Sequence, residues 1–497
     1  MADTRLVSLL QSQRSRREQA LLLRGRFSDF LIATYVCVFI TVGLAFVSER
    51  IIHWFVLPVL LCGILIGVDA VGWVCRRFDI FDPVGVIGLV GFHMFFMAPL
   101  LHVVWDHWMH YIVPPPDWRP WLGGMAILNA AGLLIYRISR GHRNPRHSFR
   151  LWHLDRTRFL ILVGVGLLLT GGLQYWVYAR YGGLFGYILE YVSRTGGFTG
   201  MGWIFTLSES FPILALMGFA VYAQKKSWGR SWFIISVVLV IYWVLLLLFG
   251  GLRGSRSATI WRVFWAAGVI HFWIRPLSKK AFLIGVILIV LFLYLYGFYK
   301  GAGLEFLRIF ESPANLPALE EQTGRTVESL LLSDLARSDV QAFLLYRLAN
   351  NNANYEYAWG RTYLGGMAIL IPRAIWPQRP PTKVKEGTEI QYGMGSYVPD
   401  RWVSSRVYGL AGEAMLNFGP FAVPFAFAVL GLVVGLIRNL FVKLQPGDAR
   451  LLLYPFLVNL CIAILIGDSD NVVFFLVKYG LVPVLLLTLA SRKHPVR

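Results

Sequence analysis

Residues 232–249 read WFIISVVLVIYWVLLLLF, and residues 250–257, which follow directly, read GGLRGSRS. The first segment has 18 residues and no charge, which is enough to cross the hydrocarbon core of a bilayer as a helix. The second combines two arginines with glycine and serine, which suits phosphate binding, because a guanidinium can bind two oxygens and glycine lets backbone N–H groups approach. On these residues alone, a short loop with its charges among lipid headgroups is the more common arrangement.

The whole chain has the composition of a membrane protein. Of its 497 residues, 57% are hydrophobic and 15% are charged, which excludes an ordinary soluble domain. The net charge of +20 would suggest nucleic acid in a soluble protein, but here it follows the loops and reports topology, so no nucleic-acid partner is expected. The four cysteines lie in or beside apolar segments, so neither a disulfide framework nor a zinc-finger spacing is present.

Hydropathy predicts an all-α, polytopic fold with about twelve transmembrane helices. A basic tail, 1–29, precedes them, and 491–497 form a second tail. The arginine- and lysine-rich loops alternate along the chain, which predicts that both termini are cytoplasmic. Nine spans fall within 30–299 and three within 412–490, with these approximate bounds: 30–47, 51–74, 84–104, 121–138, 159–178, 203–223, 232–249, 257–274, 281–299, 412–437, 451–467 and 472–490.

The segment 300–411 is the one large hydrophilic region, and the topology predicts that it is a folded extracytoplasmic loop. Within it, apolar residues recur at helical spacing over 326–350, which predicts an amphipathic helix. Residues 364–376 are apolar but too few to cross a bilayer, and Pro372 interrupts them. They predict a re-entrant or interface-lying helix.

Arginines expected on the outer face are the main functional signal. Several guanidiniums at headgroup depth could bind a lipid-linked pyrophosphate, although they could also neutralise loop acids or lipid phosphate. Arg262 lies deeper in a predicted span and is expected to face a wet cavity. Trp376, one of many aromatic residues near the outer boundary, fits an interface belt or a substrate contact. The outer-face arginines are Arg253, Arg256, Arg373, Arg401 and Arg406.

Glu413 is the main candidate carboxylate, at the expected outer end of the tenth span. It could orient or deprotonate an acceptor hydroxyl, or pair with an arginine. The 300–411 loop has no histidine, so a histidine base from that loop is excluded. His102, His107 and His110 lie near Asp106, but their spacing does not bring four ligands together, so neither a metal nor another cofactor is expected.

Three stretches together resemble the Wzy-type O-antigen and capsule repeat-unit polymerases. They are the Gly-x-Arg-Gly-Ser loop at 251–255, the Ile-Pro-Arg-x-Ile-Trp-Pro stretch at 371–377 within a large outer loop, and Gly-Glu-(x3)-Asn-Phe-Gly at 412–419. The motifs cover roughly 230–440, and the hydropathy plan covers the whole chain. Where the family often continues with Lys-Pro after the second motif, this chain has Gln378, Arg379 and Pro380.

The resemblance implies a metal-independent, inverting glycosyltransferase of the bacterial inner membrane. It would transfer a glycan from undecaprenyl pyrophosphate to a lipid-linked repeat unit, in partnership with a flippase and a chain-length regulator. Arg253 and Arg256 would act on the donor pyrophosphate with help from Arg373 and Arg406, and Glu413 would position the acceptor. Two alternatives stay open: an O-antigen ligase that uses the same donor, and a flippase or other transporter.

Overall fold

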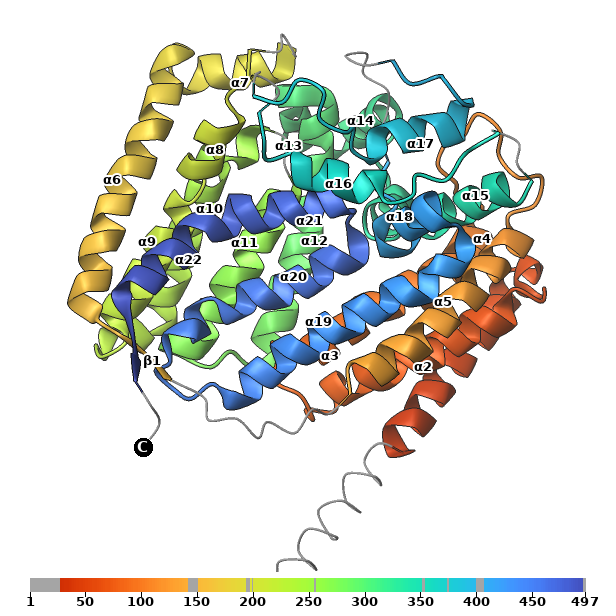
Figure 1. The fold of residues 1–497 in the computed structure, drawn as a ribbon, viewed down its shortest axis with the longest axis horizontal. Coiled ribbons are helices and arrows are strands. Elements are labelled where there is room, and N and C mark those ends of the chain that lie inside the picture. Colours follow the sequence, from red (N-terminus) through yellow and green to blue (C-terminus); the bar gives the residue numbers. More distant parts are fainter. Residues whose placement is uncertain are drawn as a thin grey trace, which may run out of the picture.

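The computed structural model describes residues 27–141, 151–193, 197–198, 200–253, 256–350, 354–372, 375–398 and 406–494, and these are almost entirely helical (Figure 1). After the first helix, Phe27–Val47, the main helices are α2 (Val56–Val74), α3 (Pro83–Phe92), α4 (Ala98–Trp105), α5 (Arg119–Ser139), α6 (Arg156–Arg180), α7 (Leu184–Ser193), α8 (Gly202–Ser208), α9 (Phe211–Ala223), α10 (Trp232–Phe249), α11 (Arg256–Val269), α12 (Lys279–Ala302), α13 (Arg308–Glu311), α14 (Leu316–Thr323), α15 (Ser338–Ala349), α16 (Arg361–Ala368), α17 (Lys383–Tyr392), α18 (Gly409–Phe418), α19 (Val423–Lys443), α20 (Tyr454–Ile466), α21 (Ser469–Phe475) and α22 (Leu481–Ala490).

Ten helices among the described residues are long and apolar enough to cross a membrane. They confirm the prediction of an all-helical chain compatible with a multi-pass membrane protein. The number twelve is not confirmed. The predicted spans 257–274 and 451–467 correspond to shorter apolar helices, Thr259–Ile274 and Tyr454–Ile466.

The predicted tenth span, 412–437, is two helices rather than one. α18 ends at Phe418, Gly419 follows with φ +83°, and the spanning helix runs from Pro420 to Lys443. Glycine adopts this left-handed conformation without strain, and proline is favoured in the first turn of the next helix. Glu413 therefore belongs to the separate helix α18.

The large loop also differs from its predicted outline. In place of one helix over 326–350, a π-helical turn, Ser329–Asp334, precedes α15. The chain breaks between them at Arg337, whose φ of −141° is not helical. Of the apolar stretch 364–376, residues 364–368 lie in α16 and residues 373–374 lie outside the described part.

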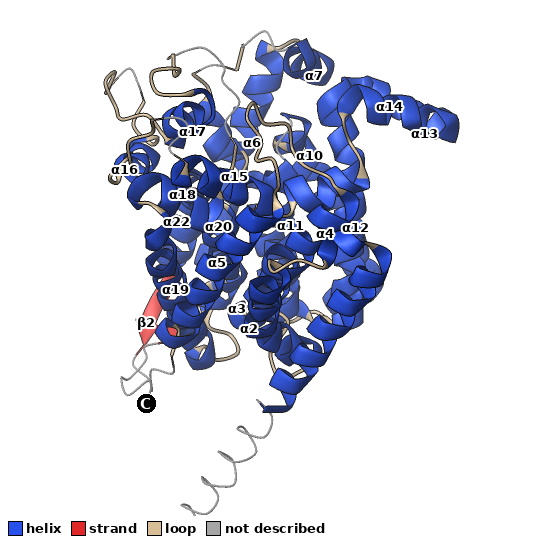
Figure 2. Ribbon diagram, turned by 90° about the vertical axis from the view of Figure 1, so that its right-hand side faces the viewer, coloured by secondary structure: helices blue, strands red, loops and turns tan. Residues whose placement is uncertain are grey.

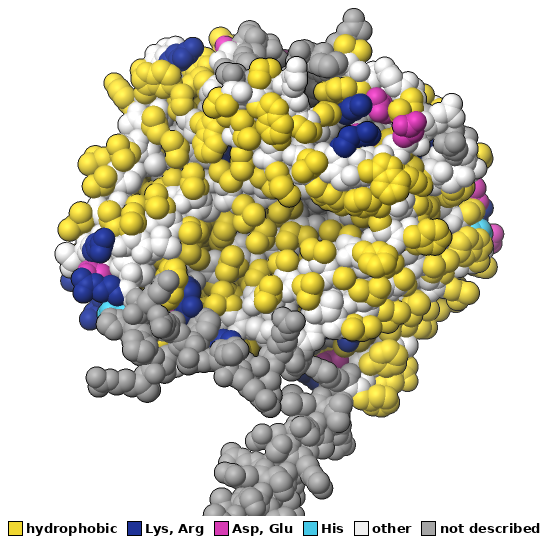
Figure 3. Space-filling view, viewed as in Figure 1, with side chains coloured by type: hydrophobic (Ala, Val, Ile, Leu, Met, Phe, Trp, Pro, Cys, Tyr) yellow, Lys and Arg dark blue, Asp and Glu magenta, His cyan; other side chains and the backbone are white. Residues whose placement is uncertain are grey.

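The bundle has two distinct ends. The terminal face carries the start of the first helix and the two-stranded antiparallel sheet of β1 (Leu151–Leu154) and β2 (Ser491–His494). The loop face, opposite, carries α7 and α13–α18 (Figures 1 and 2). On the side of the molecule that Figure 3 shows, apolar side chains dominate the surface between the two faces, as expected for contact with lipid tails.

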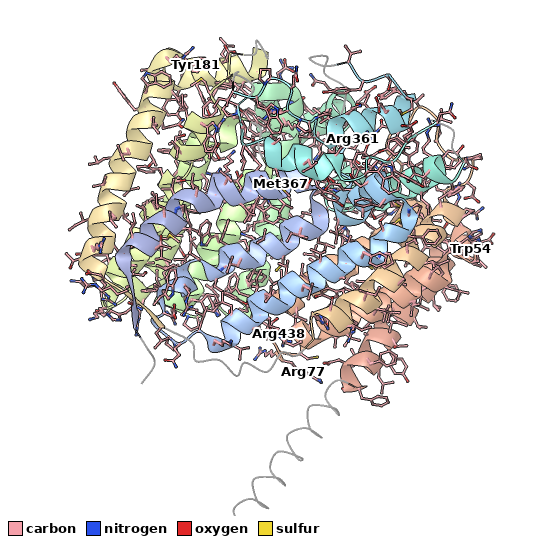
Figure 4. All side chains as sticks on the ribbon, in the orientation of Figure 1. Trp54, Arg77, Tyr181, Arg361, Met367 and Arg438 are labelled. Carbon is pink, nitrogen blue, oxygen red and sulfur yellow. The ribbon has the colours of Figure 1, made fainter. Side chains whose placement is uncertain are left out.

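Basic side chains on the terminal face pair with carboxylates at helix ends. Arg77 Nη1 lies 2.8 Å from Asp29 Oδ2, and Arg438 Nε lies 3.1 Å from Asp82 Oδ2. Figure 4 labels both arginines on this side of the bundle. Asp82 also accepts a hydrogen bond from the backbone N–H of Val84 and so caps α3.

Candidate functional site

The backbone of the 250–253 loop is held by α12. The hydroxyl of Tyr296 donates a hydrogen bond to the carbonyl of Gly251, and the hydroxyl of Tyr299 donates to the carbonyl of Leu252 at 2.8 Å. Both tyrosines lie on one face of α12, since residues three apart are neighbours on a helix. The loop is therefore a fixed part of the structure.

Arg253 belongs to a buried cluster of charges around a single carboxylate, that of Glu209. Arg253 pairs with Glu209 Oε1, Arg262 Nη2 lies 3.0 Å from Oε2, and Lys478 Nζ lies 3.0 Å from Oε1. Arg262 also donates to the backbone carbonyl of Glu209 at 3.1 Å. The side chains of Glu209 and Arg262 are each 1% exposed, and those of Lys478 and Arg253 are 8% and 14% exposed. We call these four residues the cation cluster.

The cation cluster carries more positive than negative charge. Three basic groups against one carboxylate leave a formal charge of +2 where water is largely excluded. Buried charge is costly unless it is paired, so such an excess favours the binding of an anion. Two arginines are suited to a phosphate because each offers a planar fork of N–H donors.

Arg253 has remaining capacity for a ligand. Its Nε is buried and has no hydrogen-bond partner among the described residues. Its guanidinium carbon lies 3.5 Å from the centroid of the Phe205 ring. The aromatic face fixes the orientation of the guanidinium.

The glycine that opens the loop fits against this cluster. A Cβ at Gly250 would lie 2.8 Å from Glu209 Cδ and 3.0 Å from Arg262 Nη2. Only glycine lets the backbone pass this close to the ion pairs. This contact explains the first glycine of the GGLRGSRS stretch.

Sequence reasoning missed Glu209 and Lys478, although a signal was available. Each is an ionisable residue inside an apolar segment, at 202–223 and 469–490, and such residues mark functional sites by default. Lys478 also lies in a π-helical turn, Leu476–Gly480, a local widening that is frequent at functional sites.

Glu413 lies in a second cluster, where it accepts hydrogen bonds from two neighbouring segments. Its Oε1 accepts from the Thr362 hydroxyl at 2.7 Å and from the Ser469 hydroxyl at 2.6 Å, and its Oε2 accepts from the Ser469 backbone N–H at 2.6 Å. Burial, and secondarily the nearby Asp468, raise the pKa of Glu413 to about 7. Its carboxyl group is therefore poised to change protonation near neutral pH.

Asp468 makes the reciprocal contact. Its Oδ1 accepts from the backbone N–H groups of Tyr408 at 3.0 Å and Gly409 at 2.8 Å, at the start of α18. Glu413 of α18 in turn receives the first N–H of α21, so each helix is capped by a carboxylate from the other. Lys383 of α17 pairs with Asp468 and lies 3.4 Å from Asp470 Oδ1. We call Glu413, Asp468, Asp470 and Lys383 the carboxylate cluster.

One helix joins the two clusters. Ser469–Ala490 is continuous, and Ser469 precedes Lys478 by nine residues. At a rise of 1.5 Å per residue, the two clusters are about 13 Å apart along this helix.

The remaining predicted site residues lie elsewhere or outside the described part. Arg406 donates to the carbonyl of His110, and its guanidinium carbon lies 4.2 Å from the Tyr111 ring centroid. These contacts share no residue with those of Arg253. The Trp376 side chain is 41% exposed. The following fall outside the described residues: Arg373, Arg401 and the side chain of Arg256.

Arg379, which follows the second motif, hydrogen-bonds to the end of α16. It donates to the carbonyls of Ala368, Ile369 and Ile371 at 3.2, 2.9 and 2.9 Å. Basic side chains commonly satisfy the last carbonyls of a helix in this way. Within the described ranges, no group of three or more His, Cys, Asp or Glu side chains is arranged to hold a metal ion.

These features describe an all-helical chain of the multi-pass membrane type with a buried cationic site toward its loop face. Comparison with known proteins finds no matching family model, curated protein or solved structure.

Proposed function

We propose that this chain is a membrane glycosyltransferase that polymerises oligosaccharide repeat units carried on undecaprenyl pyrophosphate. The loop face would lie on the outer side of the bacterial inner membrane, with both termini in the cytoplasm. The observation that carries the proposal is the cation cluster of formal charge +2, to which the 250–253 loop contributes Arg253. Its depth within the bundle suits a ligand that is itself held in the membrane.

In this proposal the cation cluster binds the donor pyrophosphate. The acceptor hydroxyl attacks the anomeric carbon from the side opposite the pyrophosphate. The bond from that carbon to the phosphate oxygen breaks with its electron pair going to the pyrophosphate, and the hydroxyl proton passes to water. Negative charge grows on the departing pyrophosphate. Arg253 and Arg262 would stabilise that charge from positions fixed before the reaction, which is the most effective form of electrostatic catalysis.

Glu413 takes a positioning role in the proposal. A general base must reach the hydroxyl within about 3 Å, and the hydroxyl attacks a carbon bonded directly to the leaving oxygen. The partner of Glu413 on α21, Ser469, is about 13 Å from Lys478 along the helix. Glu413 would therefore hold α16, α18 and α21 in place rather than take the proton of an acceptor bound at the cation cluster.

The first test is the surface glycan of a deletion strain, separated by gel electrophoresis. A polymerase leaves a single repeat unit in place of the ladder, which is the expected result. Full-length lipid-linked chains that never reach the acceptor core would indicate a ligase instead. Absence of any outer-face glycan would indicate a flippase.

The second test is an arginine variant with a matched control. Arg253→Lys keeps a positive charge but loses the fork of donors, and we expect it to shorten or abolish the ladder. Arg50→Ala removes an exposed arginine paired with Asp106 at 2.6 Å, with both side chains more than half exposed, and we expect a normal ladder. Protein levels are compared by immunoblot. A normal ladder in Arg253→Lys would contradict the proposal.

A further inference from the structure

Helix α7 lies across the loop face rather than along the bundle. It follows α6 through Gly182 and Gly183, whose φ values of +73° and +98° allow a sharp change of direction. Figure 1 shows α7 running across the top of the molecule, whereas α6 runs down its left side. The helix is outside the ten candidate spans.

The outward side of α7 is apolar. Among 184–192 the exposed side chains are Leu184, Phe185, Leu189 and Val192, and Phe185 and Leu189 are 82% and 66% exposed. Residues 185, 189 and 192 follow the spacing of one helical face. A helix outside the bundle core whose exposed side chains over 184–192 are all apolar needs a non-aqueous neighbour.

The inward side of α7 covers the cation cluster. Tyr187 is fully buried and its ring lies 5.1 Å from that of Tyr178. Tyr187 shares a small hydrophobic core with Leu252 and with Phe205, the ring over which Arg253 lies. The same helix therefore has the site on one side and the apolar surface on the other.

A second segment, distant in sequence, adds exposed apolar side chains beside the exposed charges of Glu305 and Arg308. After α12 the chain turns, and Leu304, Leu307 and Phe310 are 48%, 49% and 68% exposed. A Cβ at Gly303 would lie 3.1 Å from Val192 of α7, so the two segments touch. In Figure 2 this part of the chain leaves the bundle sideways at the level of the loop face.

We propose that α7 and residues 304–310 form a rim that rests in the membrane surface. The rim would place its apolar side chains at the boundary between headgroups and acyl chains. The occupant is the bilayer itself because the rim continues the outward face of the spanning helix α6, where Leu168, Leu169 and Tyr175 are 78%, 65% and 76% exposed. Arg180 lies over the Trp176 ring at 5.6 Å, an aromatic and basic pair typical of headgroup depth.

The rim also determines how a ligand reaches the cation cluster. Because α7 and its hydrophobic core cover Arg253 on the loop face, the site would be approached from the bilayer, by a phosphate carried on a lipid. This part of the inference rests on the proposed function. The membrane contact of the rim does not.

Spin labelling in lipid nanodiscs tests the rim without any activity. The full chain with Cys75→Ser, which removes its exposed cysteine, receives one labelled cysteine at 185, 189 or 321. Glu321 on α14 is exposed and polar, and serves as the aqueous control. We expect labels at 185 and 189 to be more accessible to oxygen than to a nickel chelate, and the label at 321 to show the reverse. Nickel accessibility at 185 and 189 equal to that at 321 would refute the proposal that the rim rests in the membrane surface.

A second pair of variants tests the route to the site. Phe185→Glu with Leu189→Glu places charge on the rim, and Phe185→Leu with Leu189→Phe keeps it apolar. We expect the first pair to lower glycan polymerisation at least tenfold with unchanged protein level, and the second pair to retain it. Unchanged polymerisation in the variant with both glutamates would refute the approach of the ligand to the cation cluster from the bilayer. A wild-type chain without polymerase activity would refute the proposed function alone, since the spin-label result stands independently.

Discussion

Replacing Lys383 with methionine tests the carboxylate cluster most directly. The Lys383 side chain is 5% exposed, and its ammonium pairs with the fully buried carboxylate of Asp468 and lies 3.4 Å from Asp470 Oδ1. Methionine retains most of the apolar stem, so little packing is lost. The carboxylates of Asp468 and Asp470 would then lose the ammonium that they share in a site where water is largely excluded. Removing one partner of a buried ion pair lowers the free energy of unfolding by about 3–5 kcal/mol. We expect the loss in Lys383→Met to lie near the upper end of this range.

The partner variants separate this effect from general damage. Asp468→Asn leaves Lys383 with Asp470, so we expect a smaller loss of about 3 kcal/mol. The double variant Lys383→Met with Asp468→Asn removes both charges. It should be more stable than Lys383→Met alone by about 2 kcal/mol or more, because the uncompensated buried charge is gone.

The assay is reversible unfolding in mixed micelles by titration with dodecyl sulfate, which yields the free energy of unfolding of each variant. Arg50→Met is the matched control, because Arg50 pairs with Asp106 at 2.6 Å and both side chains are more than half exposed. An exposed pair contributes about 1 kcal/mol or less. If the free energies of unfolding of Lys383→Met and Arg50→Met differ by under about 1 kcal/mol, the assignment of a structural ion pair to Lys383 is refuted.

Three further changes test other contacts in the same assay. Burial raises the pKa of Glu413 to about 7 from an ordinary 4.5. Between these pH values the folded state keeps a proton on Glu413 that the unfolded state has released. The free energy of unfolding therefore falls as the pH rises from 5 to 7. That loss is about 3 kcal/mol and should be absent in Glu413→Gln; equal pH profiles for the two proteins would contradict it. Gly366→Ala would place a Cβ 2.7 Å from Ser469 Oγ and should cost about 1–3 kcal/mol. Gly172→Ala is the control, because a Cβ at Gly172 would have no atom within 4 Å, and it should be neutral or stabilising by up to about 1 kcal/mol. Equal losses of stability in Gly366→Ala and Gly172→Ala would refute the close contact of Gly366 with Ser469. Glu209→Gln leaves the three cations without a carboxylate and should lower the free energy of unfolding by at least about 3 kcal/mol. Adding Lys478→Met to Glu209→Gln should restore part of that loss. A wild-type free energy of unfolding in Glu209→Gln alone would refute the charge excess.

Much of the fold could be predicted because hydrophobicity is a local property. Each predicted span overlaps an apolar helix among the described residues, although two of these helices are short and the tenth span is divided. The division at Gly419 could not be read in the same way, since the apolar composition continues through it. The break depends on remote contacts: the start of α18 is capped by Asp468, and Gly419 packs against Tyr357, whose ring a Cβ would approach to 3.0 Å.

The partners of the site residues could not be predicted from spacing. Glu209 and Arg253 are 44 residues apart in the chain, and Lys478 lies far beyond both. Their meeting depends on the packing of three separate helices. What the sequence does contain is the anomaly itself, a lone charge in an apolar segment, which predicts that a partner exists without saying which residue it is.

Gly250 allows the sharpest test of how the loop and the cation cluster depend on each other. Its φ of −177° lies outside the left-handed region that favours glycine. An alanine there would place its Cβ 2.8 Å from Glu209 Cδ and 3.0 Å from Arg262 Nη2. Side chains held by ion pairs cannot move aside cheaply, so we expect Gly250→Ala to lose about 1–3 kcal/mol of stability.

The neighbouring residue supplies the control. A Cβ at Gly251 would meet chiefly the end of the Leu247 side chain, at 2.9 Å, and a leucine methyl group can shift at little cost. We therefore expect Gly251→Ala to keep both the free energy of unfolding and the glycan ladder close to wild type, and Gly250→Ala to lose both. If the two alanines behave alike, the backbone of the loop does not depend on the cation cluster. The first glycine of the motif would then need another explanation.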